Sequence, residues 1–234
     1  MTYVVSDIHG CCSAWRQALE AISLSDADTL YVLGDMVDRG TGSVPLLQDM
    51  MLRPNVIPLL GNHEYMMVSV LRRLAVEITA DNAEGYLTAD DLMGCANWME
   101  NGGGPTLAAF RRLSRPEQAD ILDYLADCPL FETVSAGGRD FVLVHAGFEP
   151  FVPGRPLEDY GIEHTLFTTP AVDASYFPGR YLVTGHRPTA DRRIRRSRGH
   201  FSIDCGCVFG GSLGVLRLDD LREFYVSAPS SDIT

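Results

Sequence analysis

Carboxylate, imidazole and amide side chains directly follow apolar stretches at five places in the chain. These residues are Asp7 and His9, then Asp35, Asp38 and Arg39, then Asn62, His63 and Glu64, then His145, and finally His186. Each group alone fits an ordinary turn, because Asp and Asn stabilise turns by bonding to their own backbone. Together, so many oxygen and nitrogen ligands would repel one another unless a cation lay among them. The set therefore predicts a site for divalent metal ions.

The number of ligands predicts two ions rather than one. The candidate ligands are Asp7, His9, Asp35, Asn62, His145 and His186. Six ligands are too many for one open four-coordinate site. Two ions about 3.5–4 Å apart can share one carboxylate, and Asp35 is the expected bridge. With no thiolate in the set, we expect Mn²⁺ first and Fe or Zn²⁺ as alternatives. The other two histidines, His164 and His200, are predicted to be surface or loop residues.

A repeated pattern of strand, charged turn and helix positions the first three groups. Apolar strands are predicted over residues 3–5, 29–33 and 55–60, and helices begin at about Ser13, Ser43 and Tyr65. This alternation predicts an α/β fold with parallel βαβ units. The carboxyl ends of parallel strands lie at one edge of a sheet, where ligands bind. We therefore expect the three charged turns to be neighbours.

The later part of the chain is predicted to be mainly antiparallel. Strands are predicted over residues 130–134, 140–144, 180–186, 200–206, 212–218 and 222–226, with a helix over 115–128. Residues 76–105 are more polar and end in "NGGGP", which indicates a lid or an inserted subdomain. We expect a single catalytic domain over 1–234, with a helical lid or insertion near 76–127.

Composition narrows the class of protein and its partners. The 234 residues are 46% hydrophobic and 21% charged, which is ordinary for a soluble globular protein. A net charge of −12 argues against non-specific binding to nucleic acid or anionic membranes. There is no long apolar run and no signal-type N-terminus, so we expect a cytoplasmic protein. The six cysteines form no CxxC pair and are predicted to be structural thiols.

Arginine provides every positive side chain, and six arginines cluster in "RPTADRRIRRSR", residues 187–198. One interpretation is a solvated hairpin. The alternative is a loop that faces an anion near the active site, because guanidinium pairs bidentately with phosphate.

The motifs "DIHG", "GDMVDRG", "GNHE", "HAG" and "GH", in this order, resemble those of the calcineurin-like metallophosphoesterases. Within that family the chain resembles the Ser/Thr phosphoprotein phosphatases, most of all the short bacterial and phage (lambda phosphatase-like) enzymes. Residues 97–104, "NWMENGGG", and 202–213, "SIDCGCVFGGSL", also fit that branch. The resemblance implies a four-layer α/β/β/α sandwich of two mixed β-sheets flanked by helices.

The same resemblance implies a role for each residue that matches a motif. Asp7, His9 and Asp35 would hold the first metal, and Asp35, Asn62, His145 and His186 the second. His63 would be the general acid, Asp38 would hold its ring, and Arg39 and Asn62 would bind the phosphate. The implied reaction is direct attack on phosphorus by a hydroxide that bridges the two metals.

The sequence departs from the family pattern in two places. Family members usually carry a second phosphate-binding arginine between "HAG" and "GH", where this chain has Thr168. The "GH" motif is usually followed by threonine, where this chain has Arg187. We expect Arg187, or another arginine of the cluster, to bind the phosphate in place of the missing one.

Two substrate classes remain open. The leading expectation is a phosphoprotein, hydrolysed at phosphoserine or phosphothreonine. The alternative is a nucleotide polyphosphate, hydrolysed by a diadenosine tetraphosphate hydrolase. Relatives of that second class tend to have "GNHD" where this chain has "GNHE", which favours the phosphatase, whereas the arginine cluster favours the polyphosphate. A module that binds phosphopeptides without turnover is disfavoured, because the metal ligands, His63 and Asp38 are all present.

Overall fold

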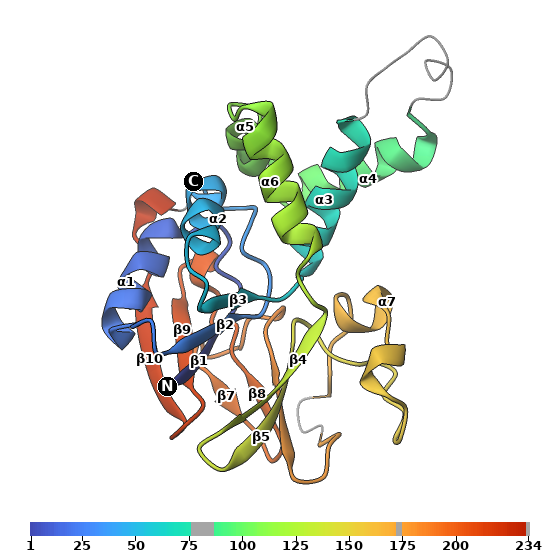
Figure 1. Ribbon diagram of the computed structural model, residues 1–234. Coiled ribbons are helices and arrows are strands. Elements are labelled where there is room, and N and C mark those ends of the chain that lie inside the picture. Colours follow the sequence, from blue (N-terminus) through green and yellow to red (C-terminus); the bar gives the residue numbers. More distant parts are fainter. Residues whose placement is uncertain (76–86, 172–174, 233–234) are drawn as a thin grey trace.

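Two five-stranded mixed sheets form the centre of the molecule in the computed structural model, which describes residues 1–75, 87–171 and 175–232. In spatial order, the first sheet contains β10 (Arg222–Ser227), β9 (Ser212–Arg217), β1 (Thr2–Val5), β2 (Thr29–Val32) and β3 (Val56–Pro58). The second contains β4 (Phe131–Ala136), β5 (Arg139–Val144), β6 (Arg180–Thr184), β8 (His200–Ser202) and β7 (Arg195–Arg196). Helices flank both sheets (Figure 1), which confirms the predicted α/β sandwich.

The three predicted βαβ units are present in the first sheet. Strands β1, β2 and β3 are parallel, and they are followed by α1 (Cys12–Ile22), α2 (Ser43–Met51) and α3 (Asn62–Leu74). One boundary differs from the prediction. Helix α3 begins at Asn62, so Asn62, His63 and Glu64 occupy its first turn rather than a loop before it. The first turn of a helix has unpaired backbone N–H groups, and the Glu64 side chain accepts the N–H of the N-cap residue Gly61 at 3.1 Å.

The prediction that the late strands are mainly antiparallel is only partly correct. Hairpins β4–β5 and β9–β10 are antiparallel, but β5, β6 and β8 are parallel to one another. Parallel pairing requires a long crossover connection, and the chain between β5 and β6 supplies one. This connection carries a short 3₁₀ turn (Leu157–Asp159) and α7 (Ile162–Thr165). Two further 3₁₀ turns lie at Cys207–Phe209 and Ser230–Asp232.

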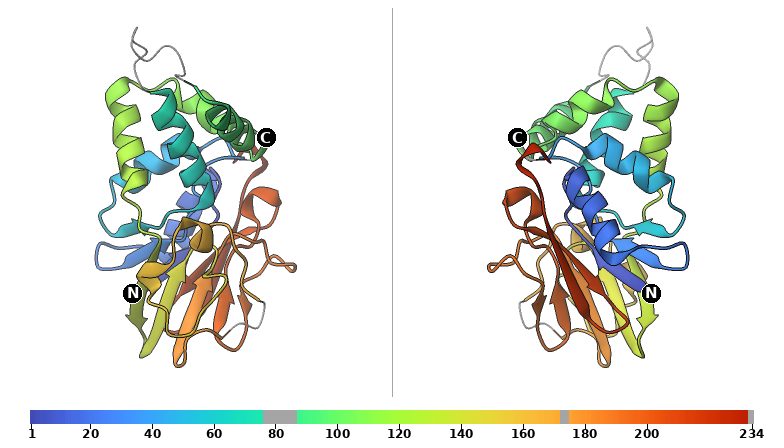
Figure 2. Two further views of the ribbon diagram at one scale, coloured as in Figure 1. Left: turned by 90° about the vertical axis from the view of Figure 1, so that its right-hand side faces the viewer. Right: turned by 90° about the vertical axis from the view of Figure 1, so that its left-hand side faces the viewer.

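Helices α4 (Ala89–Glu100), α5 (Gly104–Phe110) and α6 (Arg115–Ala126) stand with α3 at one end of the molecule (Figure 1). Figure 2 shows this group from two further sides, beyond the ends of the strands. Of the predicted lid or insertion near 76–127, residues 76–86 lie outside the described residues. No helix of the described residues is long and apolar enough to cross a membrane.

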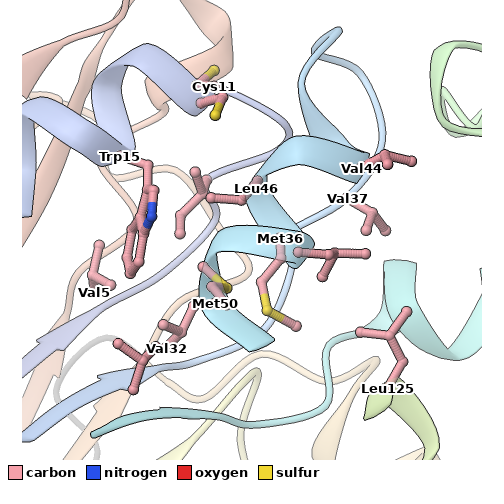
Figure 3. Packing of buried hydrophobic residues seen from close by; sticks show 14 of the residues in the cluster. Val5, Cys11, Trp15, Val32, Met36, Val37, Val44, Leu46, Met50 and Leu125 are labelled. Carbon is pink, nitrogen blue, oxygen red and sulfur yellow. The ribbon is translucent and has the colours of Figure 1, made fainter. Parts of the chain in front are cut away.

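The core lies on both faces of the first sheet, because successive side chains of a strand point to opposite faces. Val4 packs between the two sheets with Phe141 and Phe201, whereas Val5 faces the helix layer with Trp15. Figure 3 shows Val5 and Trp15 packed near Met50 of α2. The six cysteines are free, and all but Cys95 are buried, consistent with structural thiols. Packing on both faces holds β1 and β2 firmly at the edge where the charged turns begin.

Candidate metal centre

The charged turns meet at one edge, where strands of both sheets end. The parallel register pairs Val5 with Val32, so the turns after β1 and β2 run side by side. The His9 N–H donates to the Asp35 carbonyl at 2.9 Å. The second sheet joins at His186, whose backbone N–H donates to the Asp7 carboxylate at 2.9 Å. All six predicted ligands therefore lie on this rim.

Two groups of side chains on the rim have the spacing of metal sites. Ligand atoms of His9, Asp35 and His63 lie within 4.8 Å of one another, and so do those of Asp35, His145 and His186. Asp35 belongs to both groups, as expected of a bridging carboxylate. Asp7 belongs to neither, and His63 takes its place in the first group. The arrangement thus offers the predicted bridge but a different first set of ligand atoms.

The second group fits a cation because its acceptor atoms face one another. His145 Nδ1 lies 2.7 Å from the Leu33 carbonyl and must donate to it, so Nε2 of the neutral ring carries a lone pair. That atom faces Asn62 Oδ1 at 2.9 Å and Asp35 Oδ1 at 3.5 Å. Burial lowers the pKa of His145, so its ring is neutral at pH 7. Three converging acceptors are unfavourable alone and suitable for a divalent metal ion.

The first group also brings the lone pair of a neutral imidazole close to a carboxylate oxygen. His9 Nδ1 donates to the Val37 carbonyl at 2.9 Å, and its Nε2 lies 3.6 Å from Asp35 Oδ2. Burial lowers the pKa of His9 to about 3, so this ring is neutral too. Burial, and then the charges of Asp204 and Asp35, raise the pKa of Asp7 well above its ordinary value. Asp204 is a further buried acid that sequence reasoning missed, although it lies within the 202–213 motif. Its pKa is raised to about 7, mainly by burial.

The backbone of the rim is strained. Nine non-glycine residues of the described chain have positive φ, and six of them are Asp7, His9, Asp35, Asp38, Arg39 and His186. Such conformations cost about 1–3 kcal/mol each and concentrate at functional sites. The surrounding packing therefore holds these side chains in directions that a relaxed turn would not provide.

His63 lies in a buried hydrogen-bond network suited to a general acid. Its Nδ1 donates to Asp38 Oδ2 at 2.8 Å, and the indole Nε1 of Trp98 donates to the same oxygen at 2.8 Å. Burial alone would lower the pKa of His63, but Asp35 and the hydrogen bond to Asp38 outweigh it, so the pKa is raised. Trp98 was not assigned a role from sequence, although it lies in the "NWMENGGG" motif.

Arg39 lies over the same centre. Its guanidinium contacts the His9 ring, and its Nη2 lies 2.9 Å from His63 Nε2. The backbone N–H of Arg39 donates to the Gly102 carbonyl at 2.9 Å, and the guanidinium carbon lies 5.1 Å from the centre of the Phe209 ring. A fixed cation between two imidazoles is well placed to meet a phosphate oxygen.

The Trp98→Phe variant tests whether the indole positions the acid pair. It keeps the buried ring but removes the N–H that Asp38 accepts, and a hydrogen bond to a charged group contributes about 1.5–3 kcal/mol. We expect kcat to fall about tenfold and the free energy of unfolding to fall by about 2 kcal/mol.

Trp15→Phe is the matched control, because Trp15 Nε1 donates to Asp49 Oδ2 at 2.7 Å, outside the rim. It should lose stability but keep kcat. Steady-state kinetics and urea unfolding measure both quantities, and equal kcat losses in the two variants would contradict a positioning role for Trp98.

Glu64 clamps the turn after β2 to the start of α3, a role that sequence reasoning missed. Its Oε1 accepts the N–H groups of Met36 and Val37, and its Oε2 accepts those of Asp35 and Gly61. The four distances are 2.7–3.1 Å, and the side chain is fully buried. The capping-box spacing of glutamate three residues after the N-cap was the available sequence signal. Glu64 therefore shapes the rim without being exposed on it.

We expect Glu64→Gln to lower the free energy of unfolding by about 3 kcal/mol. The amide keeps one acceptor, but its NH₂ then faces backbone donors that lose their partner. Glu117→Gln is the control, because Glu117 caps α6 at the exposed surface through Ser114. It should cost less than about 1 kcal/mol. Urea unfolding of both variants measures the difference, and equal values would contradict the clamp.

The remaining predicted residues lie outside the network of Arg39. Arg187 is exposed, and its Nε donates to Thr169 Oγ1 at 3.2 Å. Thr168 Oγ1 donates to the His164 carbonyl at 2.6 Å, and His164 is half-buried in α7. The prediction that His200 is a surface or loop residue is wrong. It begins β8, is buried, and its Nε2 bonds with Thr184 Oγ1 at 2.8 Å.

Comparison with known proteins identifies the family and the fold. The family model described as "Calcineurin-like phosphoesterase" matches residues 2–190. A protein serine/threonine phosphatase from Saccharomyces cerevisiae superposes with a TM-score of 0.60, over 97% of this chain and 80% of its own. Its sequence is 15% identical, so this likeness concerns the fold alone.

Two curated relatives carry the name bis(5'-nucleosyl)-tetraphosphatase, symmetrical. The relative from Erwinia tasmaniensis is 32% identical over 263 residues, which cover 95% of this chain and 96% of that protein. The relative from Acidovorax sp. (strain JS42) is 32% identical over 150 residues, which cover 63% of this chain but only 44% of that protein. This chain therefore aligns with less than half of the Acidovorax relative and with nearly all of the Erwinia one.

Proposed function

Since this chain belongs to the calcineurin-like phosphoesterase family, we propose that its rim hydrolyses bis(5'-nucleosyl) tetraphosphates symmetrically, giving two nucleoside diphosphates. The observation that carries this proposal is the tetraphosphatase from Erwinia tasmaniensis, which aligns with nearly the whole chain. The relatives thus favour nucleotide polyphosphate, the alternative of the sequence prediction, over phosphoprotein.

The burial of Glu64 removes the main sequence argument for a protein phosphatase. That argument rested on "GNHE" in place of "GNHD". Glu64 is fully buried and its carboxylate is occupied by four backbone N–H groups, so it has no exposed surface for a substrate. The identity of this residue therefore reflects how the turn after β2 is held.

The proposed metal ligands are the rim side chains, with Asp35 shared between two ions. Asp7 and His9 would complete the first set, which leaves His63 Nε2 free to carry a proton, and Asn62, His145 and His186 would complete the second. When bound, two divalent ions would lower the pKa of water and neutralise charge on the phosphates. Oxygen and nitrogen donors of these types suit Mn²⁺, Fe or Zn²⁺.

The remaining steps belong to the chain's own side chains. Arg39 would bind a non-bridging oxygen of the attacked phosphate and orient it. The water oxygen would form a bond to one β-phosphorus while the central P–O–P bridge breaks. The bridging oxygen would leave with the other nucleoside diphosphate, and His63 Nε2 would supply its proton, with Asp38 and Trp98 holding the ring.

We also propose that α4, α5 and α6 belong to a single catalytic domain over 1–234. Trp98 of α4 donates to Asp38, and the Asp38 backbone N–H donates to Thr106 Oγ1 of α5 at 3.0 Å. An element whose side chains complete the buried hydrogen bonds of the acid pair is part of the active centre rather than a separate module.

A phosphoprotein phosphatase is the second candidate, favoured by the complete His63–Asp38 pair. A serine alkoxide is a poor leaving group and needs a placed acid more than a phosphate leaving group does.

The deciding experiment is turnover by metal-stripped protein, with and without Mn²⁺, on diadenosine tetraphosphate and on a phosphoserine peptide. The proposal expects Mn²⁺-dependent formation of ADP from the dinucleotide, with a kcat/KM at least tenfold above that for the peptide. The reverse preference would establish the phosphatase, and no turnover of either substrate would overturn both.

A further inference from the structure

A pocket of about 250 Å³ is lined in part by chain neighbours of the second group of rim residues. Ala146, Gly185 and Arg187 line it, and they are chain neighbours of His145 and His186. Its other polar lining includes Thr184, Thr189, Arg195, His200 and Ser202. None of the described residues that line it is acidic. The described lining of the pocket therefore holds no carboxylate, and part of it directly adjoins two candidate metal ligands along the chain.

The strand register builds one wall of this pocket. Strand β6 pairs Thr184 with Ser202 of β8, and β7 pairs Arg195 with the same Ser202. Paired residues point to the same face of a sheet, so the three side chains form a row. That face is the outer one, because Val183 and Phe201, the next residues along, pack between the sheets. The row also lies near the carboxyl ends of two parallel strands, where ligands bind in α/β sheets.

The floor of the pocket is built from buried polar groups. Thr184 is 2% exposed and His200 is 3% exposed, and they bond to each other at 2.8 Å. Burial, and then the charge of Arg195, lower the pKa of His200 to about 4, so its ring is neutral at pH 7. Arg195 lines the same pocket as this buried ring.

The arginines of the 187–198 cluster make different contacts. Arg193 lies over the Tyr225 ring at 4.5 Å, and Arg196 lies over the Phe201 ring at 5.3 Å. Arg187 and Arg195 line the pocket instead, and within the described residues neither pairs with a carboxylate. Two guanidiniums that have no carboxylate partner in the described part of the chain, beside four hydroxyl groups and a neutral imidazole, suit the binding of an anion.

We propose that this pocket binds the phosphates of the nucleoside diphosphate half that is not attacked, with Arg187 and Arg195 as the charged contacts. This inference rests on the proposed function, because only a polyphosphate carries further phosphates beyond the reacting one. It also gives Arg187 a different role from the expected one. Arg187 bonds with Thr169 beside the pocket, so it contacts the distal phosphate rather than replacing the missing arginine at the reacting one.

The test is calorimetric binding of ADP and of inorganic phosphate to Mn²⁺-loaded full-length protein. In the double variant Arg187→Gln/Arg195→Gln, the Kd for ADP should rise at least tenfold, whereas the Kd for phosphate should change less than threefold. The matched control is Arg193→Gln/Arg196→Gln, which removes the same charge from the same cluster. Its affinity for ADP should stay within threefold of the original.

Two other outcomes would overturn the proposed role of the pocket. Equal weakening of ADP in both double variants would indicate general electrostatic attraction. Equal weakening of ADP and phosphate in the Arg187/Arg195 variant would place these arginines at the reacting phosphate. Failure of the proposed function is separate. Wild-type protein that binds ADP through these arginines but does not cleave diadenosine tetraphosphate would retain the pocket and lose the reaction.

Discussion

The Asp35→Asn variant is expected to lose at least about 1,000-fold in kcat and to bind fewer than two metal ions per chain. Asp35 belongs to both groups of candidate ligands, and among the residues that the structure describes it is the only one that does. A metal pair contributes several kcal/mol of charge stabilisation, and each 1.36 kcal/mol corresponds to a factor of ten in rate. Asparagine has the same shape and retains an oxygen that can accept the His63 backbone N–H, now at 3.1 Å. A loss of kcat in Asp35→Asn would therefore result from removing the negative charge and not from a collapsed turn.

Metal content and activity must be measured on the same sample. Elemental analysis after loading with Mn²⁺ gives the number of ions per chain, and steady-state kinetics gives kcat. Asp49→Asn is the control. Asp49 lies on α2, outside the rim, and accepts hydrogen bonds from Trp15 and Arg53. A variant at Asp35 that retained two ions and a kcat within tenfold of the wild type would contradict the shared-carboxylate site.

The His63→Asn variant is expected to lose 10²–10⁴-fold on a phosphoserine peptide and much less on diadenosine tetraphosphate. General acid catalysis contributes about that factor when the leaving group needs a proton. A serine alkoxide needs this proton to leave. A phosphate oxygen, for which the second pKa of the phosphate is about 6, leaves readily without full protonation. The ratio of the two losses therefore measures proton donation specifically.

The comparison also separates two roles that the geometry allows for His63. The ring bonds with Asp38 as an acid pair, yet it also shares a potential metal group with His9 and Asp35. Loss of a metal ligand would reduce turnover of both substrates equally and lower the metal content. His164→Asn, a histidine of α7 outside the rim, should leave both activities unchanged. Equal losses for the two substrates in His63→Asn would overturn its role as a general acid.

The convergence of the charged turns could be predicted because it depends on local chain properties. Short apolar strands separated by helical stretches must run parallel, and parallel strands end at one edge. Asp7, Asp35 and Asn62 each follow such a strand, so their meeting requires no long-range information. The late strands were harder to predict, because the crossover between β5 and β6 contains little regular structure to reveal parallel pairing.

The contacts that tune the site could not be predicted from local patterns. Trp98 reaches Asp38 across 60 residues, and His200 reaches Thr184 by pairing of β6 with β8. Glu64 belongs to a recognisable motif, but three of its four backbone partners come from a turn 27–29 residues earlier in the chain. In each case the partner is chosen by packing between elements, which periodicity and spacing do not encode.

The sequence by itself determined the types and order of the rim residues, the α/β layers and the family, because each depends on local periodicity or on motifs in a fixed order. Only the tertiary structure decided which atoms face one another. It joined His63 with His9 and Asp35, enclosed Glu64, and separated the arginines that line the pocket, Arg187 and Arg195, from those that pack on aromatic rings. The physical reason is that side-chain direction follows strand register and the strained φ angles of the rim, and both are set by long-range packing.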